Sequence, residues 1–176
     1  MNVFIGVGVC LIVALMFLPT HSGRVRDQAR RAMCLNNLKQ IGVSLRLYRE
    51  DNSGRLPCDV NSTVLGSFAL LINNYQTSYK TWICPSDPGI LAGSAFNPWT
   101  TSNLSYAYGG FELTAGVQPD TPSVCDRSSS GNPTGPTPWQ NNMWTHKYDG
   151  GNVLFADGHV AFVKTMTPPM YRGKNP

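Results

Sequence analysis

Charged residues are scarce in this sequence, because Asp, Glu, Lys and Arg together make up 14% of its 176 residues. None of its five cysteines forms a Cys-x-x-Cys pair, which argues against a zinc-finger or zinc-ribbon site. A Gly-x-Ser-x-Gly motif, which would place a serine on a nucleophile elbow, is also absent. We therefore expect neither an enzyme nor a protein that needs a metal or another cofactor.

Long apolar runs are also missing, except at residues 3–18, which contain no charged residue. Beyond this run, apolar side chains recur at steps of four, three, four and three residues, as on one stripe of an α-helix: Cys34, Leu38, Ile41, Leu45 and Tyr48. A continuous helix from Val3 to Glu50 would be roughly 70 Å long, more than a compact domain of this size needs. We expect an N-terminal helix at 1–50, with an apolar assembly or membrane segment and an amphipathic stalk at 27–50.

The remaining residues, 51–176, should form one globular, β-rich head on this helix. The chain contains 17 Gly and 13 Pro, which favours short strands joined by long loops. The patterns predict an α+β fold, in which the helix packs on a small antiparallel sheet. The expected elements are a helix at 64–72 (a strand remains possible), an extended segment at 79–84, a strand at 105–108, a surface loop at 119–138, and a hairpin of 152–155 with 159–163.

Positive charge gathers directly after the apolar run, at Arg24, Arg26, Arg30 and Arg31. Neither interleaved aromatic residues nor a known nucleic-acid-binding module accompanies this cluster. We therefore do not expect nucleic acid as a partner. The arginines are better interpreted as a solvated or interfacial flank of the helix.

Four of the cysteines lie in the stalk or the head, at Cys34, Cys58, Cys84 and Cys125. Cys10 falls in the apolar run and is expected to be a small hydrophobic residue. The other four predict two disulfides in an oxidising compartment, and they can pair in three ways. Their residues alone leave the connectivity open.

Side chains with metal-binding chemistry occur near the C-terminal hairpin, at His146, Asp149, Asp157 and His159. Such side chains can converge on Ca²⁺ or on a transition metal. However, Asp157 has a sufficient role in an Asp-Gly turn and His159 begins a strand, so we expect no metal site. We interpret the four tryptophans of the chain as core of the head rather than as a carbohydrate-stacking face: Trp82, Trp99, Trp139 and Trp144.

Three stretches of the chain, at 30–57, 82–88 and 150–160, together resemble bacterial type IV pilin-like, or pseudopilin-like, proteins with a C-terminal His-x9-Asp-Gly signature. The first and third stretches are the specific ones. The resemblance touches most of the chain apart from roughly 90–142. It implies a pilin-like fold, with the signature hairpin at His146, Asp157, Gly158 and His159.

The function that the resemblance implies is that of a structural subunit of an extracellular filament. Copies of the chain would assemble from the bacterial inner membrane, with pilus or secretion machinery as a further partner, into a filament on the cell surface. Apolar burial would drive the helical assembly, and Pro19 should loosen the helix locally. The expected assembly core consists of Val3, Phe4, Ile5, Val7, Val9, Leu11, Ile12, Val13, Leu15, Met16, Phe17, Leu18 and Pro19.

Two other functions remain open at this point. The first is a membrane-anchored pseudopilin component of a type II-like secretion system. The second is a surface-displayed binding module that uses the aromatic side chains of its head. Abundance separates the first of these from a filament subunit, because a bulk fibre protein must be highly expressed.

Two features depart from the family pattern. Members usually carry a Gly-Phe-Thr-Leu-Ile-Glu type junction, cut by a prepilin peptidase, whereas this chain begins Met1-Asn-Val-Phe-Ile-Gly and has no such glutamate. We expect either a longer precursor or an anchor without that processing. The usual electrostatic cue for assembly, a glutamate facing a neighbour's N-terminal amine, is then missing. In addition, His146 and Asp157 enclose ten residues rather than nine, which an insertion at 147–149 would explain.

The resemblance also bears on the cysteines. The family tends to carry the cysteine of Cys-Leu-Asn-Asn and that of Cys-Pro-Ser-Asp, which implies that Cys34 pairs with Cys84 and ties the head to the stalk. This pairing leaves Cys58 with Cys125. The alternative is a disulfide between Cys58 and Cys84.

Overall fold

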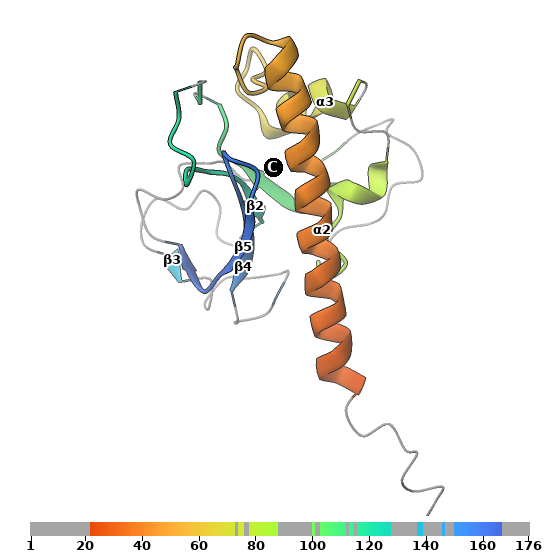
Figure 1. Cartoon of the computed structure of the whole chain (residues 1–176). Helices are drawn as coiled ribbons and strands as arrows, with labels where there is room; N and C mark the ends of the chain where they lie inside the picture. The colour runs from red at the N-terminus through yellow and green to blue at the C-terminus, as the bar shows by residue number, and fades with distance from the viewer. Residues whose placement is uncertain are drawn as a thin grey trace, which may run out of the picture.

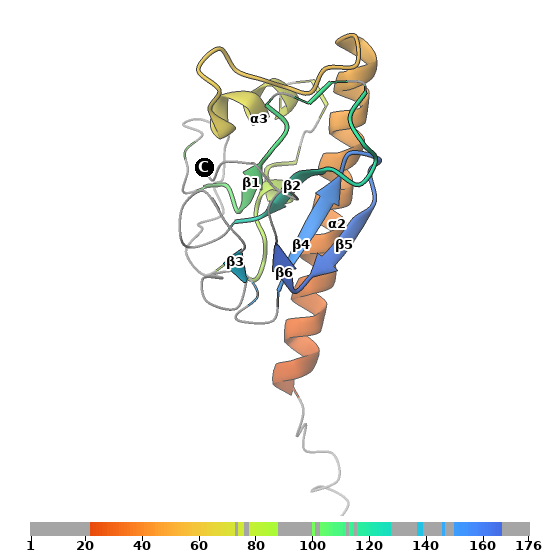
Figure 2. The same ribbon diagram turned by 90° about the vertical axis from the view of Figure 1, so that its left-hand side faces the viewer.

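The computed structural model describes residues 22–72, 74–75, 78–87, 100, 103–111, 113–114, 116–127, 137–138, 146 and 150–166. In this part of the chain, a long helix lies against a four-stranded antiparallel sheet of order β1-β2-β4-β5 (Figures 1 and 2). The elements are α2 (Ser22–Asp51), α3 (Val64–Ile72), the 3-10 helix η1 (Tyr79–Trp82), β1 (Tyr106–Tyr108), β2 (Pro122–Asp126), β3 (Thr137–Pro138), β4 (Gly151–Phe155), β5 (Val160–Val163) and β6 (Thr165–Met166). The expected α+β class is confirmed.

Helix α2 contains 30 residues, which gives a length of roughly 45 Å. The predicted stripe is confirmed, because Cys34, Leu38 and Ile41 are fully buried beneath the head. The helix ends where expected. Gly54 adopts a φ of 78°, and its N–H donates to the Arg49 carbonyl at 2.8 Å, as at a left-handed helix terminus.

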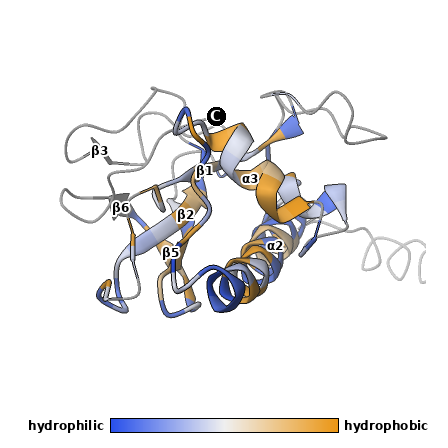
Figure 3. Ribbon diagram, turned by 90° about the horizontal axis from the view of Figure 1, so that it is seen from above, coloured by the Kyte–Doolittle hydropathy of each residue, from blue (hydrophilic) through white to orange (hydrophobic). Residues whose placement is uncertain are grey.

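The hydrophobic core lies on one side of α2, which faces both α3 and the sheet (Figure 3). The predicted helix at 64–72 is confirmed as α3. Its Phe68 ring lies 4.7 Å from the ring of Trp82 and 4.9 Å from that of Tyr108, measured between centroids. Aromatic side chains therefore fill the space between α3, η1 and β1.

The sheet has two buried faces. Val124 in β2 and Leu154 in β4 belong to the main core, whereas Cys125 and Val153 belong to a second cluster on the opposite face. The predicted hairpin is confirmed: β4 pairs with β5, and the Gly158 N–H donates to the Phe155 carbonyl at 2.9 Å. Gly158 has a φ of 93°, which a tight turn at this position requires.

The prediction of a surface loop over 119–138 is wrong for Thr137–Pro138, which form β3 and pair with β6, and for 122–126. These residues form β2, which lies between β1 and β4, and all five are buried. Pro122 occupies the first position of the strand, where a missing N–H is tolerated, and the register shifts between Pro122 and Val124. Hydrogen bonding to both neighbouring strands, β1 and β4, makes this segment a strand in spite of its polar composition, on which the prediction relied.

The prediction of an extended segment at 79–84 is wrong for Tyr79–Trp82, which form η1. Thr81 and Trp82 are both buried, although neighbouring residues of a strand point to opposite faces. A helical turn lets the Thr81 hydroxyl donate to Gln40 Oε1 at 2.9 Å while the Trp82 ring packs on Phe68. Ile83 is extended, as expected.

Several expectations lie outside the described residues. They concern the apolar run at 3–18 with Pro19, and Trp99, Trp139, Trp144 and Asp149. Within the part of the chain that the structure describes, no helix has the length and apolar character needed to cross a membrane.

Candidate functional site

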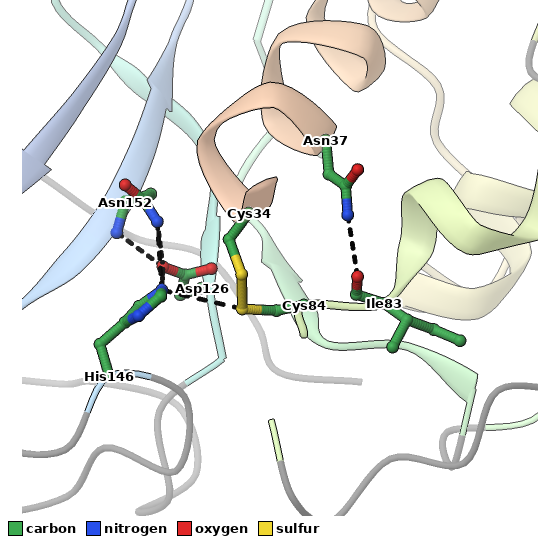
Figure 4. Close-up of polar contacts among 7 residues, drawn as sticks. All are labelled: Cys34, Asn37, Ile83, Cys84, Asp126, His146 and Asn152. Carbon is green, nitrogen blue, oxygen red and sulfur yellow. Dashed lines mark hydrogen bonds and ion pairs between the residues drawn. A yellow bond between two sulfur atoms is a disulfide. The ribbon is translucent and has the colours of Figure 1, made fainter. Parts of the chain in front are cut away.

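Five buried side chains from separate parts of the chain meet where α2 contacts the sheet (Figure 4). We call this group the junction cluster: Cys34 in α2, Cys84 after η1, Asp126 at the end of β2, His146, and Asn152 in β4. None of these residues is more than 3% exposed.

The first contact in the cluster is a disulfide between Cys34 and Cys84, which lie 50 residues apart. Their Cα atoms are 4.9 Å apart. One turn further along α2, Asn37 Nδ2 donates to the Ile83 carbonyl at 2.8 Å. The pairing that the resemblance implied is therefore confirmed, and the helix is fixed both covalently and by hydrogen bonding to the segment after η1.

The second contact is a set of donors around the carboxylate of Asp126. The backbone N–H of Asn152 donates to Asp126 Oδ2 at 2.7 Å, and its side-chain Nδ2 donates to the same oxygen at 3.0 Å. His146 Nε2 lies 3.0 Å from that oxygen and 3.7 Å from Cys84 Sγ. A buried carboxylate requires such donors, because its charge has lost its water. These bonds join β2, β4 and His146.

The other carboxylate oxygen of this residue, Asp126 Oδ1, is buried without a hydrogen-bond partner among the described residues. An unsatisfied buried acceptor is unusual in a folded protein and has a cost in stability. Sequence reasoning missed Asp126 and Asn152 altogether, because no motif marks residues that meet only through strand pairing.

The residues of the C-terminal signature do not converge. His146 belongs to the junction cluster, whereas Asp157 and His159 lie at the exposed β4–β5 turn. There His159 Nδ1 lies 2.6 Å from Asp157 Oδ1, and the imidazole stacks on the Phe155 ring at 4.2 Å. The His159 backbone N–H, followed by its imidazole, lowers the pKa of Asp157 by hydrogen bonding to the carboxylate.

The expected second disulfide, between Cys58 and Cys125, is wrong. Cys58 is an exposed thiol, whereas Cys125 is buried in β2 and packs with Ala107 and Val153. The pairing assumed that Cys125 lies on a surface loop, but it lies in a central strand. The alternative between Cys58 and Cys84 is also wrong, because Cys84 is bonded to Cys34.

A second apolar stripe runs along the exposed side of α2, where Val43 also lines the groove described below. We call it the outer stripe: Val25, Met33, Val43 and Leu47, each between 44% and 62% exposed. At 3.6 residues per turn these side chains lie within about 80° of one another around the helix, roughly opposite the buried stripe. Over Gly23–Met33 no side chain is buried, and Arg31 contacts the head in this range, with its Cζ 5.1 Å from the centre of the Phe162 ring, so the helix before Arg31 extends past the head (Figure 1).

A groove of about 680 Å³ lies between α2 and the β4–β5 turn. Its lining includes Lys39, Arg46, Arg49, Phe155 and Asp157. Arg46 pairs with Glu50 at 3.1 Å, and Arg49 Nη1 donates to the Ala156 carbonyl at 3.3 Å. The groove depends on how the hairpin meets the helix, which sequence reasoning did not predict.

Comparison with protein-family models, with curated proteins and with solved structures finds no match for this chain. The family resemblance therefore rests on the sequence stretches alone.

Proposed function

We propose that this chain is a structural subunit of an extracellular filament of the type IV pilus kind, which polymerises through its N-terminal helix. The observation that carries the proposal is that α2 has apolar side chains on two opposite faces, whereas the head covers one of them. The outer stripe is suited to contact other copies of the chain.

The free end of α2 supports this proposal. The helix before Arg31 extends past the head toward the N-terminus, where the sequence contains the apolar run at 3–18 (Figure 2). Complete burial of a Val, Leu or Met side chain contributes roughly 1.5–3 kcal/mol. Covering the outer stripe and the apolar run in each copy therefore provides a driving force that repeats along a fibre.

The disulfide of the junction cluster is consistent with this function. Disulfides persist in oxidising compartments outside the cytosol, where a filament would be located. The bond keeps helix and head together, which a subunit must do if its helix lies in the filament core and its head lies outside. The proposed partners are other copies of the chain, the inner membrane before assembly, and the assembly machinery.

Electron microscopy and mass spectrometry of material sheared from cells that express the full-length chain test the proposal. We expect thin, uniform fibres that consist mainly of this protein, with an intact mass two hydrogens below that of the reduced chain, one disulfide per copy. Protein that stays in the membrane fraction without fibres would instead favour a pseudopilin component of a secretion system.

The groove supports a second candidate, a surface-displayed binding module. Lys39, Arg46 and Arg49 outnumber the two carboxylates of the lining, Glu50 and Asp157, and this excess of positive charge suits an acidic polysaccharide. Retention of the full-length chain on immobilised acidic polysaccharide, with weaker retention of the Lys39→Ala variant, would support this function. Equal retention on a neutral polysaccharide would argue against it.

A further inference from the structure

The junction cluster contains the components of a metal site. Cys34 Sγ, Cys84 Sγ and a ring nitrogen of His146 all lie within 4.8 Å of one another. The carboxylate of Asp126 adjoins the histidine of this group, with Oδ2 lying 3.0 Å from His146 Nε2. We propose that the reduced chain binds one Zn²⁺ ion through Cys34, Cys84, His146 and Asp126, independently of whether the chain forms filaments.

The chemistry of these four side chains fits zinc. Two thiolates, one imidazole and one carboxylate provide the four sulfur, nitrogen and oxygen ligands of a tetrahedral zinc site, and thiolates disfavour Ca²⁺ and Mg²⁺. All four side chains are buried. Buried ligands on several elements are typical of a closed structural site rather than a catalytic one, which keeps a position open to water.

The carboxylate of Asp126 provides a second, independent observation. Its Oδ1 is buried and has no hydrogen-bond partner in the part of the chain that the structure describes. A metal ion satisfies this oxygen. Meanwhile Asn152 holds Oδ2 with two donors, the arrangement by which outer-shell residues orient a metal-binding carboxylate.

The oxidation state of the two sulfurs decides whether the ion binds. In the structure they are joined to each other, so no thiolate is present. A dithiol reductant breaks the S–S bond by supplying two electrons and two protons, and becomes a disulfide itself. Zn²⁺ then displaces one proton from each thiol as it binds.

The site thus has two alternative cross-links at the same place. In a reducing compartment the metal ion joins α2 to the segment after η1, and after oxidation the disulfide does so. The sequence predicted no metal site because its ligands have no short spacing: Cys34 and Cys84 lie 50 residues apart, and Cys84 and His146 lie 62 apart.

Metal titration of the full-length chain in detergent tests the proposal, with Co²⁺ as a spectroscopic probe and Zn²⁺ as its competitor. Disulfides are first reduced with a phosphine, which takes its oxygen from water, and air is excluded. We expect one Co²⁺ per reduced chain, with the thiolate-to-cobalt charge-transfer absorption, and its loss when Zn²⁺ is added. The oxidised chain should show no such absorption.

Variants locate the site. Cys84→Ser and Asp126→Asn should each weaken Zn²⁺ binding by at least about tenfold, because each removes a ligand. Cys58→Ser is the matched control, since it removes an exposed thiol outside the cluster, and it should bind as the unaltered chain does. Unchanged affinity in Cys84→Ser, or equal loss in Cys58→Ser, would overturn the proposal.

A thermal readout covers the case in which a variant does not fold. Zn²⁺ should raise the melting temperature of the reduced, unaltered chain and leave that of the oxidised chain unchanged, because a ligand stabilises only the state that binds it. If the reduced chain takes up no metal, or if Zn²⁺ shifts both forms equally, the assignment is wrong.

Discussion

Asn152 in β4 makes two hydrogen bonds to the buried carboxylate of Asp126 in β2, one from its backbone and one from its side chain. The side-chain amide also lies 3.1 Å from His146 Nε2. One residue therefore connects a central strand, its neighbour and the histidine beside the disulfide. Because all these groups are buried, bulk water cannot replace a hydrogen bond that a substitution removes.

The Asn152→Ala substitution removes the side-chain donor and keeps the backbone donor. We expect it to lower the free energy of unfolding by about 1–3 kcal/mol, since a buried charge loses a hydrogen bond. Urea denaturation of the oxidised chain measures this. Asn36→Ala is the matched control, because Asn36 is exposed on α2 and its loss should cost no more than about 0.5 kcal/mol. Equal costs would show that the buried network contributes nothing.

Two buried tyrosines should make the fold sensitive to alkali. Burial raises the pKa of Tyr106 and Tyr108 well above the ordinary 10.0, and the charge of Asp126 adds to the effect on Tyr106. The folded chain keeps both hydroxyls protonated while the unfolded chain releases their protons above pH 10.0, so the free energy of unfolding falls as the pH rises past that value. Below it, this contribution is fully present.

Ultraviolet titration of tyrosinate in the folded chain measures this effect. We expect part of the signal of the seven tyrosines to appear only when the chain unfolds. The Tyr106→Phe and Tyr108→Phe variants should each reduce that delayed part. A single transition of all tyrosines near the ordinary value in a chain that is still folded would contradict the prediction.

At the scale of elements, α2 approaches β4 closely at Gly42. A Cβ atom there would lie 2.9 Å from Leu154 Cδ1, whose side chain is buried. We expect Gly42→Val to lower the free energy of unfolding by about 1–3 kcal/mol, because the extra atoms overpack the core. Gly23→Val is the control in the same helix, since nothing lies within 4 Å of its Cβ position. Thermal unfolding compares the two, and a similar loss in both would show that crowding against Leu154 is not its cause, because Val has a higher helix propensity than Gly.

The outer stripe of α2 should matter for assembly but not for folding. We expect Val43→Glu to reduce the yield of sheared fibres at least about tenfold, because it places a charge in an apolar contact between copies. Val60→Glu makes the same change at a valine that is 94% exposed and lies outside α2, so its yield should stay unchanged. Electron microscopy and quantitative immunoblotting of sheared material measure both. Normal fibres from Val43→Glu would remove the outer stripe from the interface.

Elements with a local signal could be predicted from the sequence. The stripe of α2 and the turn at Gly158 follow from residue spacing and from glycine, so both are confirmed. The strand β2 could not be predicted, because its burial depends on pairing with β1 and β4 rather than on its own pattern. For the same reason the contact between Asp126 and His146 has no signal in the sequence. The disulfide followed from family resemblance and not from spacing.

At the scale of the whole molecule, the disulfide closes a loop that contains most of α2, all of α3 and η1. Cross-linking residues 50 apart restricts the unfolded chain, with a typical stabilisation of about 2–4 kcal/mol. We therefore expect the double variant Cys34→Ala/Cys84→Ala to lose about that much in urea denaturation. Cys58→Ala, which alters an exposed thiol, should lose no more than about 0.5 kcal/mol. A double variant as stable as the oxidised chain would contradict this.

The position of the disulfide also determines how the molecule bears tension. Cys34 is the first buried residue over Gly23–Asp51, one turn of helix after Arg31 contacts the head. A pull on the N-terminal end of the helix reaches the head at Cys34 and crosses the sulfur–sulfur bond directly to Cys84. If the head is held anywhere after Cys84, the chain between the two cysteines lies outside the path of the load. The part of α2 after Cys34, together with α3 and η1, then carries no force, because the covalent bond transmits it.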